Sequence, residues 1–186
     1  MSTQTLRTRL RTETAASHER LDALVSAFDL RTPSGLAAFL SMQASALGAI
    51  SGGPGSAPTR EMAADLAARA RADLALLEQA GRLTIPSLPR DLDPLAVDYI
   101  VSGSRLGTMV LKRRWEASTD RQVRAARNYF TAPSYIETWK VFCAEAEQEG
   151  FDPARKRKIV NDTNVLFDFY AGCASSTKKL EGMGHG

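Results

Sequence analysis

The sequence has few of the residues on which common metal and redox sites depend. It contains two cysteines, Cys143 and Cys173, and two histidines, His18 and His185, among 186 residues. The cysteines form no CxxC pair and have no accompanying histidines, which argues against a disulfide framework or zinc site and favours a reducing cytoplasm. The sequence has no Glu-x-x-His pair, so a di-iron carboxylate bundle is disfavoured. It also has no flavin or dinucleotide motif, so a redox enzyme of this sequence would take its electrons from outside the chain.

Long apolar runs and a strong charge imbalance are missing as well. A membrane-spanning helix needs about 20 apolar residues in a row, and the N-terminus lacks the apolar core of a secretory signal; we therefore expect no membrane association. The net charge of +3 is too small to indicate a nucleic-acid partner, for which a clustered basic face is expected. The length predicts a single domain over residues 1–186 with a substantial core. We expect a loose C-terminal tail from about residue 177.

What the sequence does have is helical periodicity, because apolar residues recur every three or four positions almost throughout. Prolines mark several helix starts, and "SGGPGSAP" is the clearest loop. The fold class is therefore predicted to be all-α, a single bundle of about seven or eight helices. The expected helices span residues 6–28, 33–47, 59–80, 94–115, 133–149 and 153–175, with a short helix within 118–130.

His18 is the one histidine outside the expected tail, and it lies at the border of the apolar stripe of the first helix. A partly buried histidine bonded to a backbone carbonyl is one interpretation. Arg11 lies two turns before it, however, and a histidine beside an apolar face with a nearby cation suits haem: the imidazole ligates iron and the arginine meets a propionate. Asp22, one turn after His18, either orients the other imidazole nitrogen or is a solvated surface carboxylate.

Two glycines interrupt the helical segment "YIVSGSRLGTMVLKRRW". Gly103 and Gly107 lie four residues apart on one helical face, and each costs a helix about 1 kcal/mol relative to alanine. Either the backbone lies directly over a flat ligand, or the glycines permit close helix–helix packing. Spacing alone leaves both interpretations open.

Taken together, "LRTETAASHERLD" and "GSRLGTMVL" resemble the proximal and distal helices of haem oxygenases, the second in the G-S-x-L-G form of bacterial members. The segment "VLFDFY" in the last helix is similar to the family's pocket-lining aromatic stretch. The resemblance covers about residues 5–175. It implies a haem oxygenase type of fold, in which haem is sandwiched between the two helices.

By this resemblance His18 is the proximal iron ligand and Arg11 pairs with a haem propionate. Tyr99 and Tyr170 would edge the pocket and bond to propionates, and Phe167 would pack on the macrocycle. For each of these three aromatic residues, ordinary core packing is the alternative.

On the distal side, the resemblance implies that Gly103 and Gly107 lie over the haem face. Ser104 holds the position at which animal members carry an aspartate that organises distal water. Trp139 and Cys143 hold positions at which the family offers basic residues to the propionates, which is a departure from the family pattern.

The implied activity is oxidative cleavage of haem b, both cofactor and substrate, to biliverdin, carbon monoxide and ferrous iron, using dioxygen and external electrons. Lys112, Arg113 and Arg114 either dock an acidic donor such as ferredoxin or flavodoxin, or form a solvated helix end that complements the helix dipole. Biliverdin formation would serve iron release or supply a bacterial photoreceptor. The rival hypotheses are a non-enzymatic haem carrier or sensor on the same fold, and a helical interaction protein without a cofactor.

Overall fold

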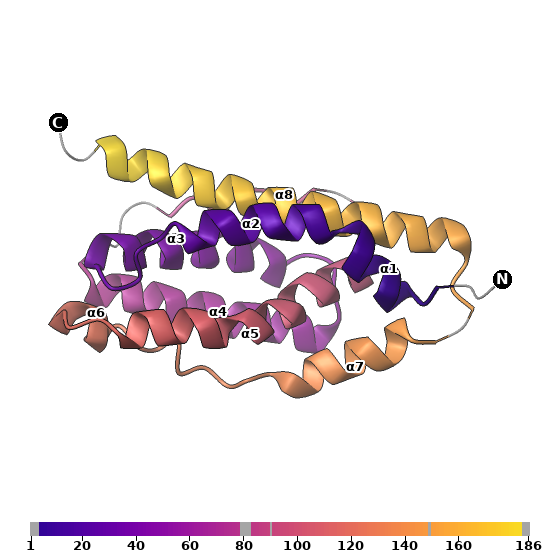
Figure 1. Cartoon of the computed structure of the whole chain (residues 1–186), viewed down its shortest axis with the longest axis horizontal. Coiled ribbons are helices and arrows are strands. Elements are labelled where there is room, and N and C mark those ends of the chain that lie inside the picture. Colours follow the sequence, from indigo (N-terminus) through magenta and orange to yellow (C-terminus); the bar gives the residue numbers. More distant parts are fainter. Residues whose placement is uncertain (1–3, 79–82, 90, 149, 184–186) are drawn as a thin grey trace.

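The computed structural model describes residues 4–78, 83–89, 91–148 and 150–183, with side chains as far as Thr177. No strand occurs in these ranges, so the all-α prediction is confirmed. The helices of the described residues are, in chain order, α1 (Leu6–Glu13), α2 (Ala15–Ser26), α3 (Pro33–Ser51), α4 (Ala57–Leu76), α5 (Pro94–Glu116), α6 (Arg121–Ala125), α7 (Ile136–Ala146) and α8 (Pro153–Met183) (Figure 1).

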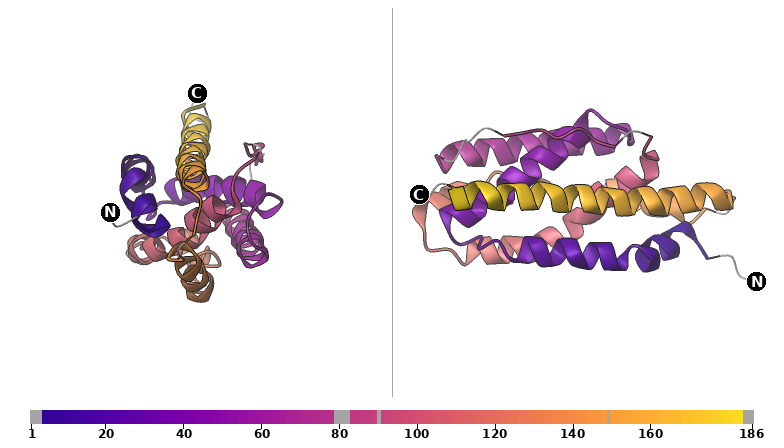
Figure 2. Two further views of the ribbon diagram at one scale, coloured as in Figure 1. Left: turned by 90° about the vertical axis from the view of Figure 1, so that its right-hand side faces the viewer. Right: turned by 90° about the horizontal axis from the view of Figure 1, so that it is seen from above.

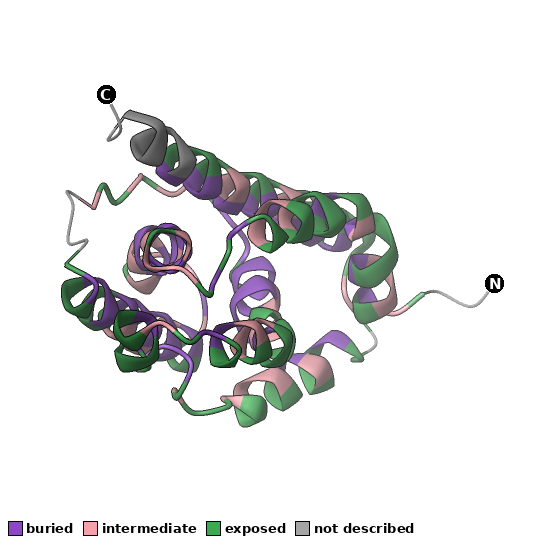
Figure 3. Ribbon diagram, turned by 60° about the vertical axis from the view of Figure 1, so that its left-hand side comes forward, coloured by how far each residue is buried: buried purple, intermediate pink, exposed green. Residues whose placement is uncertain are grey.

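The bundle is built around α3, which packs against α4 and α8 and carries much of the core. Phe39, Leu40 and Leu47 of this helix are almost completely buried, and Figure 3 shows buried positions turned toward the interior of the bundle. Within the described residues, α3 alone is long and apolar enough to cross a membrane by length and composition, which the sequence analysis did not single out. Because 61% of that window is buried, α3 has the surroundings of a core helix.

The longest helix, α8, lies along one side of the bundle with α2 beside it, as two views show (Figures 1 and 2). Helix α5 packs against α8 and α7, and α7 also contacts α1. The side of the molecule formed by α1, α2, α5, α7 and α8 therefore brings both motif-bearing segments together.

Several helix starts follow from local chemistry. The side chains of Thr32 and Asp93 accept hydrogen bonds from backbone amides in the first turns of α3 and α5. Pro33 and Pro94 take the first helical positions, where the missing amide proton has no intrahelical partner to lose. The predicted starts of these two helices are confirmed, and so is the start of α8 at Pro153.

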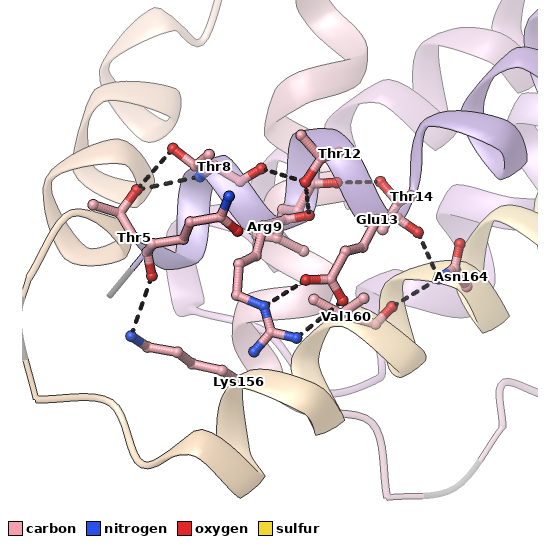
Figure 4. A network of polar contacts seen from close by, with 11 residues as sticks. Thr5, Thr8, Arg9, Thr12, Glu13, Thr14, Lys156, Val160 and Asn164 are labelled. Carbon is pink, nitrogen blue, oxygen red and sulfur yellow. Dashed lines mark hydrogen bonds and ion pairs between the residues drawn. The ribbon is translucent and has the colours of Figure 1, made fainter. Parts of the chain in front are cut away.

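The prediction of one continuous helix over residues 6–28 is wrong. Thr14, with φ −111° and ψ 2°, separates α1 from α2. Its hydroxyl donates to the Leu10 carbonyl at 2.7 Å, a local bond that competes with regular helix. The break is fixed to α8, where the Asn164 amide donates to the Glu13 carbonyl at 3.5 Å, within the polar network drawn in Figure 4.

Other helix boundaries also differ from the predictions. The helix expected from Pro133 begins only at Ile136, because Tyr135 adopts a left-handed conformation with φ 54°. The final helix continues to Met183 and does not end near residue 175 as predicted. Residues 184–186, and with them His185, lie outside the described residues.

Candidate functional site

A cavity of about 730 Å³ lies between α1, α2, α5 and α8, with contributions from α3 and α7. Its size is in the range typical of cofactor and small-molecule sites. All eight site residues expected from the sequence line it, although they come from four different helices. These residues are Arg11, His18, Tyr99, Gly103, Ser104, Gly107, Phe167 and Tyr170.

The imidazole of His18 is open to the cavity, with 58% of its side chain exposed. It makes no hydrogen bond to a backbone carbonyl within the described residues, so the interpretation as a bonded core histidine does not describe this structure. Its ring centroid lies 5.4 Å from that of Phe167, at an interplanar angle of 54°. Nε2 lies 3.6 Å from the Asp22 carboxylate, which is too long for a hydrogen bond and leaves that nitrogen available to a ligand.

One end of the cavity is electropositive. Tyr99, Arg7 and Arg11 all line it there. Burial raises the pKa of the Tyr99 phenol, while the neighbouring Thr14 hydroxyl and the charges of Arg11 and Arg7 act in the opposite direction. The Arg7 guanidinium lies 3.4 Å from the Glu147 carboxylate, whereas Arg11 makes no hydrogen bond or ion pair within the described residues. Arg11 is therefore the cation available to an anionic ligand group.

The two glycines of α5 differ in their surroundings. A Cβ added at Gly103 would lie 3.2 Å from Cζ3 of Trp139, so close packing against α7 explains this glycine. A Cβ added at Gly107 would meet no heavy atom within 4 Å. Since Gly107 lines the cavity, helix–helix packing does not explain its lack of a side chain. Trp139 also lines the cavity and stacks on Phe142, with centroids 5.4 Å apart.

Ser104 is exposed at the cavity wall. Its hydroxyl donates to the Val101 carbonyl at 2.8 Å. Because a serine hydroxyl carries one proton, the oxygen acts toward the cavity as an acceptor. A water molecule beside Ser104 would therefore donate to it.

The polar surroundings of Tyr170 differ from those of Tyr99. It is 4% exposed, and its hydroxyl has no hydrogen-bond partner within the described residues. Burial raises its pKa, and nearby Tyr129 and Cys173 raise it further, so the hydroxyl stays protonated. The Arg105 guanidinium lies over the Tyr129 ring, 5.6 Å from its centroid. The groups that act on Tyr170 therefore differ from those that act on Tyr99, and propionate binding by either tyrosine stays a prediction.

Several residues line the cavity that were not predicted from the sequence. Arg7 lies one turn before Arg11, so helical spacing could have identified it. Tyr129 follows α6 in a loop, and Met42 and Gln43 come from the core helix α3. No motif marks these three, because their place at the cavity depends on tertiary packing.

The basic end of α5 is partly committed to the fold. Arg114 donates to two backbone carbonyls where α2 ends, and Lys112 lies 4.0 Å from the Glu116 carboxylate. Arg113 is exposed and makes no hydrogen bond or ion pair within the described residues. Of the three residues expected to dock an acidic donor, Arg113 is thus the one whose side chain makes no polar contact with the rest of the described residues.

No protein-family model matches the chain, and no curated protein sequence matches it. Within the described residues, no group of three or more histidine, cysteine, aspartate or glutamate side chains is placed to hold a metal ion. The donor set at the cavity is a single imidazole with one carboxylate beside it. A metal that binds here would need most of its ligands from another molecule, as iron in a porphyrin has.

Proposed function

We propose that the cavity binds haem and that the protein is a haem oxygenase. The observation that carries the proposal is the exposed imidazole of His18 in a cavity that also has an arginine unpaired within the described residues and a glycine, Gly107, with open space beside it. Haem requires an axial ligand, apolar walls and cations for its propionates. His18, Phe167 and Arg11 supply one of each.

The residues present fit this ligand on both faces. His18 and Phe167 would lie on the proximal side, and Gly107 of α5 offers unfilled space on the other. Arg11 would hold a propionate, with the Tyr99 phenol beside it.

When bound, haem b would supply the iron and the dioxygen chemistry by which it is opened to biliverdin, carbon monoxide and ferrous iron. The chain's contribution is to hold and orient it. His18 offers Nε2, which makes no hydrogen bond within the described residues and has the Asp22 carboxylate 3.6 Å away. Ser104 offers an acceptor for water on the α5 side. The residues lining that side include no histidine or carboxylate that would act as a strong acid or base there.

Electrons would come from an acidic donor such as ferredoxin or flavodoxin, with Arg113 as a docking residue. Biliverdin would pass to an acceptor such as a bacterial photoreceptor or be discarded after iron release. We propose a cytoplasmic location, consistent with two cysteines that form no disulfide in the structure.

A haem titration of the purified protein tests the proposal. We expect a Soret band at one haem per chain, its loss or marked shift in His18→Ala, and an unchanged band in the matched control His185→Ala. Ascorbate or reduced ferredoxin should then yield biliverdin, identified by chromatography. Absence of a Soret band in the wild-type protein would refute haem binding. A normal band without biliverdin would instead support a haem carrier or sensor on the same fold.

A further inference from the structure

Tyr170 has a buried hydroxyl whose hydrogen-bonding capacity is unused. The residue lines the cavity, is 4% exposed, and finds no partner for its hydroxyl within the described residues. Buried polar groups of folded proteins are nearly always paired, and exceptions call for an explanation. A partner supplied by the cavity's ligand is such an explanation.

The surroundings of Tyr170 limit what that partner can be. Arg7 and Arg11 act on Tyr99, whereas the ionisable groups that act on Tyr170 are Tyr129 and Cys173. Phe167 lies one turn earlier on the same face of α8 and also lines the cavity. The hydroxyl of Tyr170 therefore belongs to an aromatic part of the cavity, apart from Arg7 and Arg11. Arg105 lies over the Tyr129 ring but does not line the cavity, so the hydroxyl suits an uncharged acceptor.

Haem itself offers no such acceptor once its propionates lie at the arginine end. The rest of the haem rim consists of methyl, vinyl and methine groups, none of which accepts a hydrogen bond. Ring opening changes this, because a methine carbon leaves as carbon monoxide and each of the two cut ends gains an oxygen atom from dioxygen. These lactam oxygens are carbonyl acceptors of the kind that a phenol pairs with.

We infer that Tyr170 donates a hydrogen bond to a lactam oxygen of the open-chain tetrapyrrole, and so holds the product by a contact that haem cannot make. The inference rests on the proposed function. It adds to that function a residue that distinguishes product from substrate: Arg11 and Tyr99 hold both molecules by their shared propionates, and Tyr170 holds only the product.

Parallel titrations of the haem-free protein with haem and with biliverdin isomers, prepared by coupled oxidation of haem, test this inference. Tyr170→Phe keeps the ring and removes only the hydroxyl. We expect it to weaken binding of the preferred biliverdin isomer about twofold to tenfold, the value of one neutral hydrogen bond, and to leave haem affinity unchanged. Because the hydroxyl is unpaired without ligand, the denaturation midpoint of the haem-free variant should not fall.

Tyr99→Phe is the matched control, since it removes the same atom at the arginine end and should weaken both ligands equally. Equal losses for both ligands in Tyr170→Phe, a loss for haem alone, or no loss at all would each overturn the inference. These results are distinct from failure of the proposed function, in which the wild-type protein would not bind haem.

Discussion

Replacement of Gly107 by alanine should change the stability of the haem-free protein and the binding of haem in opposite directions. An alanine Cβ at this position meets no heavy atom within 4 Å, so the substitution carries no steric cost in the haem-free state. Glycine inside a helix costs about 1 kcal/mol relative to alanine. The haem-free variant should therefore be more stable by about 1 kcal/mol, which for a chain of this length raises the melting temperature by about 2–4 °C.

The same methyl group should disturb haem binding. Gly107 lines the cavity on the α5 side, and its missing side chain would leave room for water or dioxygen over the haem face. We expect Gly107→Ala to shift the Soret band and lower the biliverdin yield, and Gly107→Leu to do so more strongly. Both variants should retain ligation by His18, because the proximal side is untouched.

Gly172→Ala is the matched control. Gly172 is exposed on α8, and a Cβ there also meets no atom within 4 Å, but the residue does not line the cavity. It should give the same gain in melting temperature by circular dichroism, with unchanged haem titration and product yield. A Gly107→Leu protein with a normal Soret band and normal biliverdin yield would refute the distal role of α5.

Three further predictions concern the arginine end and the fold. Arg11→Glu should weaken haem binding by about 1.5–3 kcal/mol, the value of a charge-assisted hydrogen bond. The exposed control Arg157→Glu should leave the haem titration unchanged. Equal haem affinities of Arg11→Glu and wild type would show that Arg11 does not hold a propionate. Gly35→Ala should destabilise the protein by about 1–3 kcal/mol in urea denaturation, because its Cβ would lie 2.3 Å from a backbone carbonyl oxygen, whereas Gly52→Ala, with no atom within 4 Å, should stay near wild type. Burial and a bonded carboxylate raise the pKa of Tyr135 to about 12. The contribution of this shift to stability is therefore complete below pH 10 and is lost as the pH rises toward 12. Tyr135→Phe should lose less unfolding free energy than wild type between pH 9 and 11.5, and identical pH profiles would contradict the raised pKa of Tyr135.

The parts of the fold that were predicted correctly are those that local chemistry determines. Pro33 and Pro94 begin helices because proline fits the first helical position and a preceding side chain caps the helix. At Thr14 a local bond to the Leu10 carbonyl is joined by a bond from the distant Asn164 to the end of α1. The late start after Tyr135 accompanies a bond from the Tyr135 hydroxyl to Asp65 of α4. Periodicity along a single segment carries no information about such contacts.

The same distinction applies to the candidate site. Helical spacing placed Arg11 near His18 and put both glycines of α5 on one face, and the structure brings these residues to one cavity. Spacing could not separate Tyr99 from Tyr170, because their surroundings depend on how α5 and α8 pack against the other helices. Tyr129 reaches the cavity from a loop without any motif. The positions of site residues within one helix could therefore be predicted from the sequence. Which residues of different helices lie together in the cavity could not.

Two kinds of interaction remain incomplete around this cavity, and haem would complete both. Leu106 and Val110 line it with 52% and 62% of their surface exposed, which is apolar area left in contact with water. Arg11 lines it as well and has no anionic partner within the described residues. A helical bundle that served only as an interaction surface would be more stable if the apolar area were buried and the arginine were paired. A flat, largely apolar molecule with carboxylates at one edge matches the apolar wall and the arginine together, which favours haem over a cofactor-free role for this protein.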